Sequence, residues 1–271
     1  MICLHDQLVE VVSKNLKINV FSNNHVGINL FYLKRKKPEV MQNRIVVLTG
    51  AGISAESGIK TFRDDDGLWK HYRFEEVASP EAWHKHPEDV LEFYNQRRKN
   101  VIEAEPNAAH MALVKLEDYF DVKIITQNVD DLHERAGSKD VIHLHGEIRK
   151  ARSSNDPSLI YPVEGWELNR VDKAEDGSQL RPHVVWFGEP VPMFDIAIEM
   201  AREADILLII GTSLNVYPAA SIYQFAGKNV PKFYVDPEAN ETISIENLKI
   251  MKEKAGTAVP DLVTYLIDNF K

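Results

Sequence analysis

The sequence predicts an α/β protein with a doubly wound parallel sheet and a second, smaller module inserted into it. Short apolar, β-branched runs alternate with longer helical stretches from residue 45 to the end of the chain. The first run, 45–48, leads directly into the glycine turn Thr49-Gly-Ala-Gly52. The segments 62–103 and 151–182 break the alternation, so we expect them to form the smaller module.

The apolar runs predict the order of the elements. Ligands of such sheets bind at the carboxyl ends of the strands. The expected core strands are 45–48, 122–126, 141–144, 184–187, 206–210 and 232–235, and the expected helices are 87–103, 107–119, 193–203, 218–227 and 259–270.

The first forty residues differ from the rest. Their least polar stretch, 18–33, is broken by asparagines and followed by four basic residues, so neither a membrane span nor a cleaved signal is expected. We interpret residues 1–40 as an extension upstream of a natural start at Met41; a native extension is the alternative. A chain starting at Met41 should then fold and act normally. The catalytic domain is expected over 41–271, with its large part at 41–61, 104–150 and 183–271.

Composition limits the function classes. The chain has 271 residues, 44% of them hydrophobic, which is enough for a sizeable core. Its net charge of -9 is spread along the chain, so no nucleic-acid partner is expected. The single cysteine, Cys3, excludes an internal disulfide and a cysteine zinc knuckle within one chain. With no membrane partner expected either, we predict a cytoplasmic monomer.

The glycine turn is the first candidate site. Gly50, Ala51 and Gly52 follow a strand and precede a helix, where backbone N–H groups can bind a pyrophosphate. Ser54 can cap that helix or donate to the phosphate. Alone, the turn is a weak signal, because many such turns bind nothing.

The longer motifs are specific, and with them the chain resembles the sirtuin family of NAD-consuming lysine deacylases over residues 45–270. The resemblance implies a Rossmann-like sheet and NAD that is consumed as a co-substrate. The motifs are Gly50-Ala-Gly-Ile-Ser-Ala-Glu-Ser-Gly-Ile59, Thr61-Phe-Arg63, Thr126-Gln-Asn-Val-Asp130, His143-Leu-His-Gly146, Arg181-Pro-His-Val-Val-Trp-Phe-Gly-Glu189 and Gly211-Thr-Ser213.

The resemblance implies roles around NAD. Phe62 and Arg63 would cover the nicotinamide ribose, Asn128 and Asp130 would line the nicotinamide site, and Gln127 would contact the ribose. A second turn after 206–210 is expected to hold the adenosine side. Its residues are Gly211, Thr212 and Ser213, joined by Asp236 as a ribose ligand and by the backbone of Ala258, placed before the last helix.

Three histidines could act as the base, because an unperturbed imidazole titrates near neutrality: His133, His143 and His145. The family pattern selects His145, directly before the glycine, and makes a packing role the expectation for His143. The implied reaction transfers the acyl group from lysine to ADP-ribose and releases nicotinamide. His145 would deprotonate a ribose hydroxyl, and no protein nucleophile is needed.

The helix 87–103 carries a specificity signal. Tyr94 and Arg97 lie three residues apart and share a face of that helix. A phenol and a guanidinium suit a carboxylate, and the pair matches the Tyr-x-x-Arg of class III sirtuins, with Ala78 as the small residue beside it. We therefore predict succinyl- or malonyl-lysine, besides acetyl-lysine, as the substrate. An extended peptide is expected along 184–189 and 214–216. Its contacts would include Val184, Phe187, Gly188 and Val216.

The smaller module departs from the family pattern. Most sirtuins hold a structural zinc ion there with four cysteines, whereas residues 151–182 contain neither cysteine nor histidine. Carboxylates alone are a poor zinc set, so we predict no zinc. Side-chain packing is expected to replace the ion through Ile160, Tyr161, Val163, Trp166 and Leu168.

Other functions of the same site stay open at this point. Mono-ADP-ribosyl transfer would use the same NAD residues without the Tyr94 and Arg97 pair, and an NAD-sensing module would need no base. A dehydrogenase is disfavoured, because His-Gly and a second turn replace the usual G-x-G-x-x-G followed by a ribose acid.

Overall fold

The computed structural model of the protein describes residues 11–13, 16–18, 42–60, 74–240, 242 and 244–271. The chain divides into two units, 1–41 and 42–271. In the first unit, strands β1 (Val11–Ser13) and β2 (Leu16–Ile18) form an antiparallel pair. The interpretation of residues 1–40 as an upstream extension stays a prediction. Within the described residues, no helix is long and apolar enough to cross a membrane.

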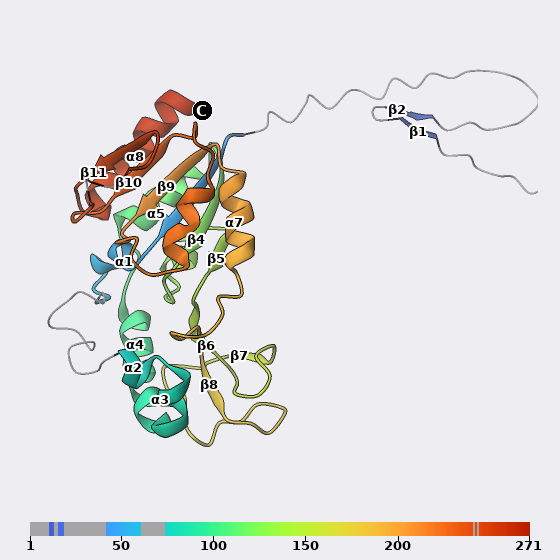
Figure 1. Cartoon of the computed structure of the whole chain (residues 1–271), viewed down its shortest axis with the longest axis vertical. Helices are drawn as coiled ribbons and strands as arrows, with labels where there is room; N and C mark the ends of the chain where they lie inside the picture. Colours follow the sequence, from blue (N-terminus) through green and yellow to red (C-terminus); the bar gives the residue numbers. More distant parts are fainter. Residues whose placement is uncertain (1–10, 14–15, 19–41, 61–73, 241, 243) are drawn as a thin grey trace, which may run out of the picture. The chain divides into compact units, whose positions relative to one another are not determined.

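The second unit contains a six-stranded parallel sheet, which confirms the predicted fold class (Figure 1). The predicted core strand 184–187 does not belong to it, and a strand near the C-terminus, which the sequence patterns did not indicate, forms one edge. The order is β11 (Leu248–Met251), β10 (Lys232–Val235), β9 (Ile206–Ile210), β3 (Arg44–Thr49), β4 (Asp121–Thr126) and β5 (Val141–His143).

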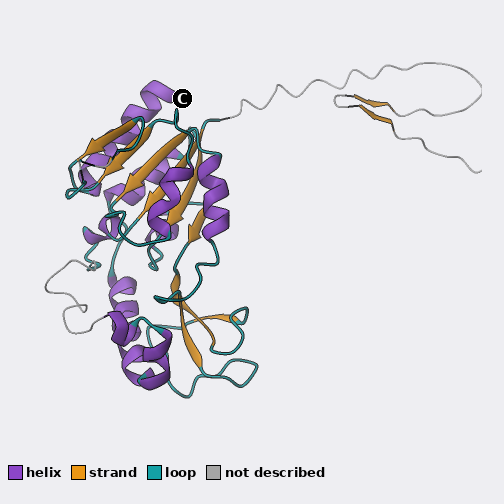
Figure 2. Cartoon of the chain, viewed as in Figure 1, coloured by secondary structure: helices purple, strands orange, loops and turns teal. Residues whose placement is uncertain are grey.

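Both faces of the sheet are covered by helices, as the continuously apolar strands require (Figure 2). Ile45 and Val47 of β3 pack on one face with helices α5 (Ala108–Leu116) and α8 (Ala255–Phe270). Val46 and Leu48 pack on the other face with α7 (Phe194–Arg202) and the 3-10 helix η2 (Ala219–Phe225). Alternate residues of one strand therefore pack into the two hydrophobic cores on opposite faces of the sheet.

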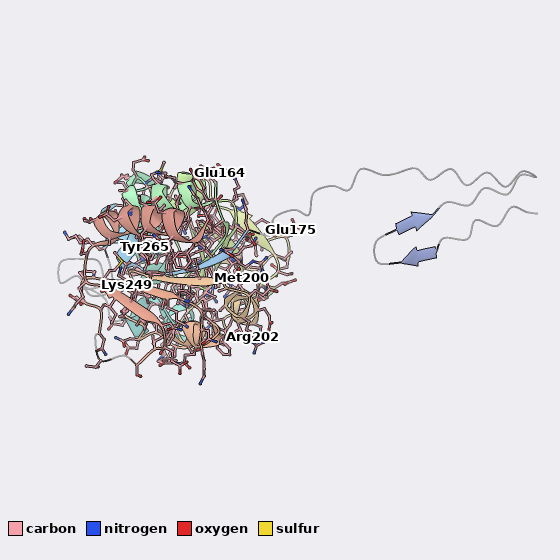
Figure 3. All side chains as sticks on the ribbon, turned by 90° about the horizontal axis from the view of Figure 1, so that it is seen from above. Glu164, Glu175, Met200, Arg202, Lys249 and Tyr265 are labelled. Atoms are coloured by element: carbon pink, nitrogen blue, oxygen red, sulfur yellow. The ribbon has the colours of Figure 1, made fainter. Side chains whose placement is uncertain are left out.

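The edge strand β11 is attached from one side only. It pairs with β10, and Lys249 lies 5.1 Å from the ring centroid of Tyr265 on α8, where Figure 3 shows both side chains. Its residues are half-buried or exposed. This partial burial explains why the apolar pattern of the sequence did not reveal β11.

The last helix begins earlier than predicted, at Ala255 rather than at residue 259. Pro260 lies inside it, although proline usually marks a helix start. The carboxylate of Glu56 accepts a hydrogen bond from the N–H of Gly256 at 2.6 Å and so satisfies one of the free donors of the first turn. Ala258 is thus a buried helical residue whose N–H donates to Lys254.

The smaller module combines helices and an antiparallel sheet (Figure 1). Arg98 of α4 is fully buried and ties the two parts together, because its guanidinium donates to the carbonyl groups of Ile148 and Trp166. The elements are α2 (Phe74–Val77), α3 (Pro80–Lys85) and α4 (Pro87–Glu103), with the three strands β7 (Ile160–Pro162), β6 (Gly146–Ser153) and β8 (Leu180–Val184).

One predicted core strand is wrong. Val184 ends β8 and pairs with Gly146 of β6 in the antiparallel sheet, and residues 185–187 are not in a strand. A short apolar run does not tell which sheet it joins, and here it turns to pack under α4. β6 starts at Gly146, five residues before the predicted start of this segment of the smaller module at residue 151. The exact division between the large part and the smaller module stays a prediction.

The predicted packing of the module holds for some residues only. Val163 and Leu168 are buried in one cluster, and Tyr161 packs against it, but Ile160 is exposed and Trp166 lies against Lys99. Among the described residues, no three His, Cys, Asp or Glu side chains are grouped to hold a metal ion.

A hydrogen-bond network lies where the strands of this module meet their loops. Ser153 is 2% exposed; its hydroxyl lies 2.7 Å from both Asp176 and Ser178 and accepts from the N–H groups of Asn155 and Asp156. This one side chain joins the end of β6 to the loop before β8.

Candidate active site

The two glycine turns at the carboxyl ends of β3 and β9 pack directly against each other. Gly50 and Gly52 donate to the carbonyl groups of Ile210 and Gly211 at 3.0 and 2.8 Å. A Cβ on Gly211, which has φ +62°, would lie 2.3 Å from the backbone nitrogen of Ile53. These glycines therefore allow the close approach of two backbones. The N–H groups of Gly50 and Gly52 are already paired, so they are not free donors here, and the predicted approach of this turn to a phosphate stays a prediction.

A buried polar cluster follows these turns. Asn128 donates from Nδ2 to the hydroxyl of Ser54 at 3.1 Å and to the carbonyl of Gly50 at 3.2 Å. Ser54 in turn donates to Asp130 at 3.1 Å. The predicted capping role of Ser54 is wrong, because it lies inside α1 (Gly52–Ala55) and Ala51 is the N-cap. Burial raises the pKa of Asp130, although hydrogen bonds from Leu132 N–H and Ser54 favour its charged form.

His145 lies beside this cluster with one ring nitrogen fixed. Its Nδ1 is 2.9 Å from the carbonyl oxygen of Gln127, which can only accept, so Nδ1 carries the proton. Burial lowers the pKa of His145, partly offset by this hydrogen bond. The neutral ring therefore keeps its lone pair on Nε2.

His143 has the opposite character. Its Nδ1 lies 2.9 Å from the carbonyl of Asn128 and its Nε2 lies 2.8 Å from Glu134. Burial alone would lower the pKa of His143, but the hydrogen bond and charge of Glu134 outweigh it and the pKa is raised. Acceptors at both nitrogens and the raised pKa favour the imidazolium form of His143, which has no lone pair for base chemistry.

The third histidine lies behind the site. His133 Nε2 is 3.1 Å from the hydroxyl of Thr49, which bonds to Thr126, and Thr126 accepts from the N–H of Asn128. Burial lowers the pKa of His133 well below its ordinary value. The neutral His133 ring thus supports the loop that carries Asn128.

Tyr94 and Arg97 project from α4, as their spacing predicts. Tyr94 is 3% exposed, and burial raises its pKa to about 12, although the charge of Arg97 opposes this. Arg97 is half-buried and interacts electrostatically with Tyr94 and with Asp130 of the polar cluster. Ala78 is buried in the same apolar cluster as Tyr94. Arg97 of the α4 pair therefore lies within electrostatic range of the polar cluster.

Backbone N–H groups of the segment 184–189, where a peptide was expected to bind, already make hydrogen bonds within the protein. Val185 donates to the carbonyl of His145 and Phe187 donates to that of Ala78. Val184 is buried with Tyr94, so its side chain is not a surface contact. Phe187 and Val216 are exposed, at 43% and 38%.

Gly188, at φ +90°, has open space around it. The N–H groups of Val185 and Phe187 are paired within the chain, and the expected peptide contacts stay a prediction. Leu214, the first residue of the second predicted peptide segment, also has a left-handed φ of 55°.

The expected adenosine side gathers at the ends of β9 and β10. Gln127 donates to the hydroxyl of Thr212 at 3.0 Å, and Ser213 is half-buried next to it. Asp236 is 5% exposed and accepts from the N–H of Glu238 at 2.8 Å. Ala258 does not lie before the helix as predicted, and its N–H is paired, so it has no donor for adenine. Phe62 and Arg63 lie outside the described residues.

Comparison with known proteins decides the family. The Sir2 family model matches residues 50–218. The chain belongs to the Sir2 family. A Helicobacter pylori relative named NAD-dependent protein deacylase is 54% identical over 224 residues, covering 83% of this chain and 97% of that protein.

Solved structures agree with this assignment. A Sir2 homologue in complex with NAD matches with a TM-score of 0.76 and 41% identity, covering 85% of this chain and 91% of that one. A Sir2 protein with a deacetylated p53 peptide and 3'-O-acetyl ADP-ribose matches with a TM-score of 0.70 and 31% identity over 84% and 93% of the two chains.

Two features of this Sir2-family site were missed by sequence reasoning. Trp186 donates from Nε1 to the hydroxyl of Tyr94 at 3.1 Å, and the pair Thr49 and His133 supports Asn128. Trp186 lies within the motif 181–189, and that motif is the sequence signal that could have identified it. The contact with Tyr94 joins residues far apart in sequence and no local pattern indicates it.

Proposed function

We propose that this Sir2-family chain is an NAD-dependent protein-lysine deacylase that prefers acidic acyl groups such as succinyl and malonyl. The observation that carries the preference is the pair on α4: a neutral buried phenol and a guanidinium beside the polar cluster that holds Asn128 and Asp130. A carboxylate accepts hydrogen bonds from both groups at once.

The residues of the site fit NAD as the co-substrate. The carboxamide of nicotinamide has donors and an acceptor, and the cluster of Ser54, Asn128 and Asp130 offers both in a buried setting. We assign Gln127, Thr212, Ser213 and Asp236 to the ribose and adenosine side because they lie at the carboxyl ends of parallel strands. Relatives named for NAD dependence support this assignment.

We assign His145 as the general base. Its Nε2 lone pair takes the proton of a ribose hydroxyl, while Gln127 holds the ring through Nδ1. The low pKa keeps the ring neutral at physiological pH. His143 and His133 act as support in this proposal, because both ring nitrogens of His143 lie against acceptors and His133 is buried behind Thr49.

The test is NAD-dependent release of succinyl and acetyl groups from matched lysine peptides. The wild-type protein should give the larger kcat/KM with succinyl-lysine, and Arg97→Met should lower the succinyl-to-acetyl ratio by roughly tenfold or more, the worth of a charged hydrogen bond. Lys99→Met is the matched control, because it removes an exposed cation from the same helix. Turnover of acetyl alone would leave a deacylase without the acidic preference, and no turnover of either would reject the proposal.

A further inference from the structure

Trp186 contacts the proposed acyl-binding tyrosine through a directional hydrogen bond. Its indole Nε1 lies 3.1 Å from the hydroxyl oxygen of Tyr94, and the two ring centroids are 6.5 Å apart. Both side chains are almost fully buried, at 2% and 3% exposure. An indole N–H can only donate, so the Tyr94 oxygen is the acceptor in this bond.

This polarity determines what the Tyr94 hydroxyl can do with its own proton. The proton cannot lie along the bond to Trp186, and Arg97 cannot take it because a guanidinium has no acceptor. Burial keeps the phenol protonated at neutral pH, with a pKa of about 12. The O–H is therefore available to an acceptor next to Arg97, and a carboxylate is such an acceptor.

Trp186 is itself held from several sides. The Arg181 guanidinium carbon lies 3.2 Å from the centroid of its ring, and the backbone N–H of Trp186 donates to Glu189 at 2.8 Å. Arg181 binds the same carboxylate through two hydrogen bonds of 2.7 and 3.1 Å, and Arg152 also donates to it. The indole therefore has little freedom to rotate away from Tyr94.

We propose that Trp186 is a positioning residue for acyl specificity: its indole N–H orients the Tyr94 hydroxyl so that the phenol proton points to the carboxylate of an acidic acyl group. This inference rests on the proposed function. It predicts that Trp186 affects acidic acyl groups more than acetyl, which has no carboxylate.

The test combines a substitution with a double-mutant cycle. In Trp186→Phe the N–H is lost, and the succinyl-to-acetyl ratio of kcat/KM should fall by roughly tenfold, mainly through a higher KM for the succinyl peptide. In a Tyr94→Phe background the same change should alter the ratio by less than about twofold, because the hydroxyl is already gone. Trp166→Phe is the matched control, since Trp166 packs against Lys99 rather than Tyr94.

A second measurement does not depend on activity or on folding of the Trp186 variant. The indole 15N–1H cross-peak of Trp186 should move in Tyr94→Phe and also when succinyl-lysine peptide binds the wild-type protein, but less with acetyl-lysine peptide. An indole cross-peak whose chemical shift is unchanged in Tyr94→Phe would overturn the inference.

Failure of the inference can be told apart from failure of the proposed function. A succinyl preference in the wild-type protein that Trp186→Phe leaves intact, or an equal loss with both peptides, would overturn the inference alone. A wild-type protein without a succinyl preference would overturn the proposed acidic specificity, and this inference with it.

Discussion

The Nδ1 atom of His145 and the carbonyl oxygen of Gln127 are 2.9 Å apart. This hydrogen bond links the base to the strand-end loop that also carries Asn128, and it selects the tautomer with a free Nε2. The same loop therefore sets both the position of the ring and its tautomer.

The proposed base leads to a pH prediction. Because burial lowers the pKa of His145, the neutral form persists below the ordinary histidine value near 6.5. We expect kcat/KM for an acyl-lysine peptide to be flat around pH 7 and to fall with acid through a pKa below 6.5. His145→Asn should lower kcat about 10²–10⁴-fold. His84→Asn, on an exposed histidine of α3, is the control. An acid limb that survives unchanged in His145→Asn would exclude this histidine as the titrating base.

Local patterns predicted the elements that are continuously apolar or have clear boundaries in the sequence. The bounds of α4, β9 and β10 match the predicted ranges, because each is a strongly apolar or clearly delimited segment. The positions of the strand-end residues Gln127 and Thr212 also follow from such patterns, since parallel strands end at one edge of a sheet.

Long-range contacts explain what the patterns could not predict. Ser54 was expected to serve its own helix, but its partner Asp130 comes from another loop. The N-terminal turn of α8 is completed by Glu56, which no local signal near Pro260 indicates. Trp186 was likewise visible only as part of a motif. In each case the role of the residue or helix end depends on a side chain that is distant in sequence.

The contact between the two glycine turns predicts unequal effects of alanine. Gly211 and Gly58 both have positive φ, at 62° and 87°, but only Gly211 has backbone atoms within reach of an added Cβ. Gly58→Ala should cost about 1–2 kcal/mol of unfolding free energy from conformational strain alone. Gly211→Ala should cost roughly 3 kcal/mol or more, because the backbone of α1 must move. Urea denaturation measures both, and equal losses would show that the close contact adds nothing.

The Ser153 network makes a prediction for the smaller module. Ser153→Ala leaves two backbone N–H groups and the Asp176 carboxylate without this partner, so we expect a loss of roughly 1–3 kcal/mol in unfolding free energy. Ser154→Ala is the matched control, because that neighbouring hydroxyl makes one exposed bond to the carbonyl of Gln179. A loss in Ser153→Ala no larger than in the control would mean that the network does not stabilise the module.

The buried pair His110 and His133, with ring centroids 4.9 Å apart, predicts a loss of stability in acid. Burial lowers the pKa of His110 to about 4, whereas the unfolded chain titrates near 6.5. The unfolded state therefore binds more protons between these values, so this contribution to stability is complete above pH 6.5 and decreases toward pH 4. For His110 alone the loss from pH 7 to pH 5 should be roughly 2 kcal/mol.

His110→Gln isolates this contribution. Glutamine does not titrate, and it can keep the capping box in which Asn107 donates its N–H to the side chain at this position. The difference in unfolding free energy between the wild-type protein and His110→Gln, measured by urea denaturation at pH 7 and pH 5, should shift by roughly 2 kcal/mol in favour of the variant at the lower pH. The raised pKa of His143 is common to both proteins, so its effect cancels in this comparison. His133 contacts His110, so any change in the titration of His133 is included in the measured difference. A difference that stays constant with pH would mean that His110 is protonated in the folded protein as readily as in the unfolded chain.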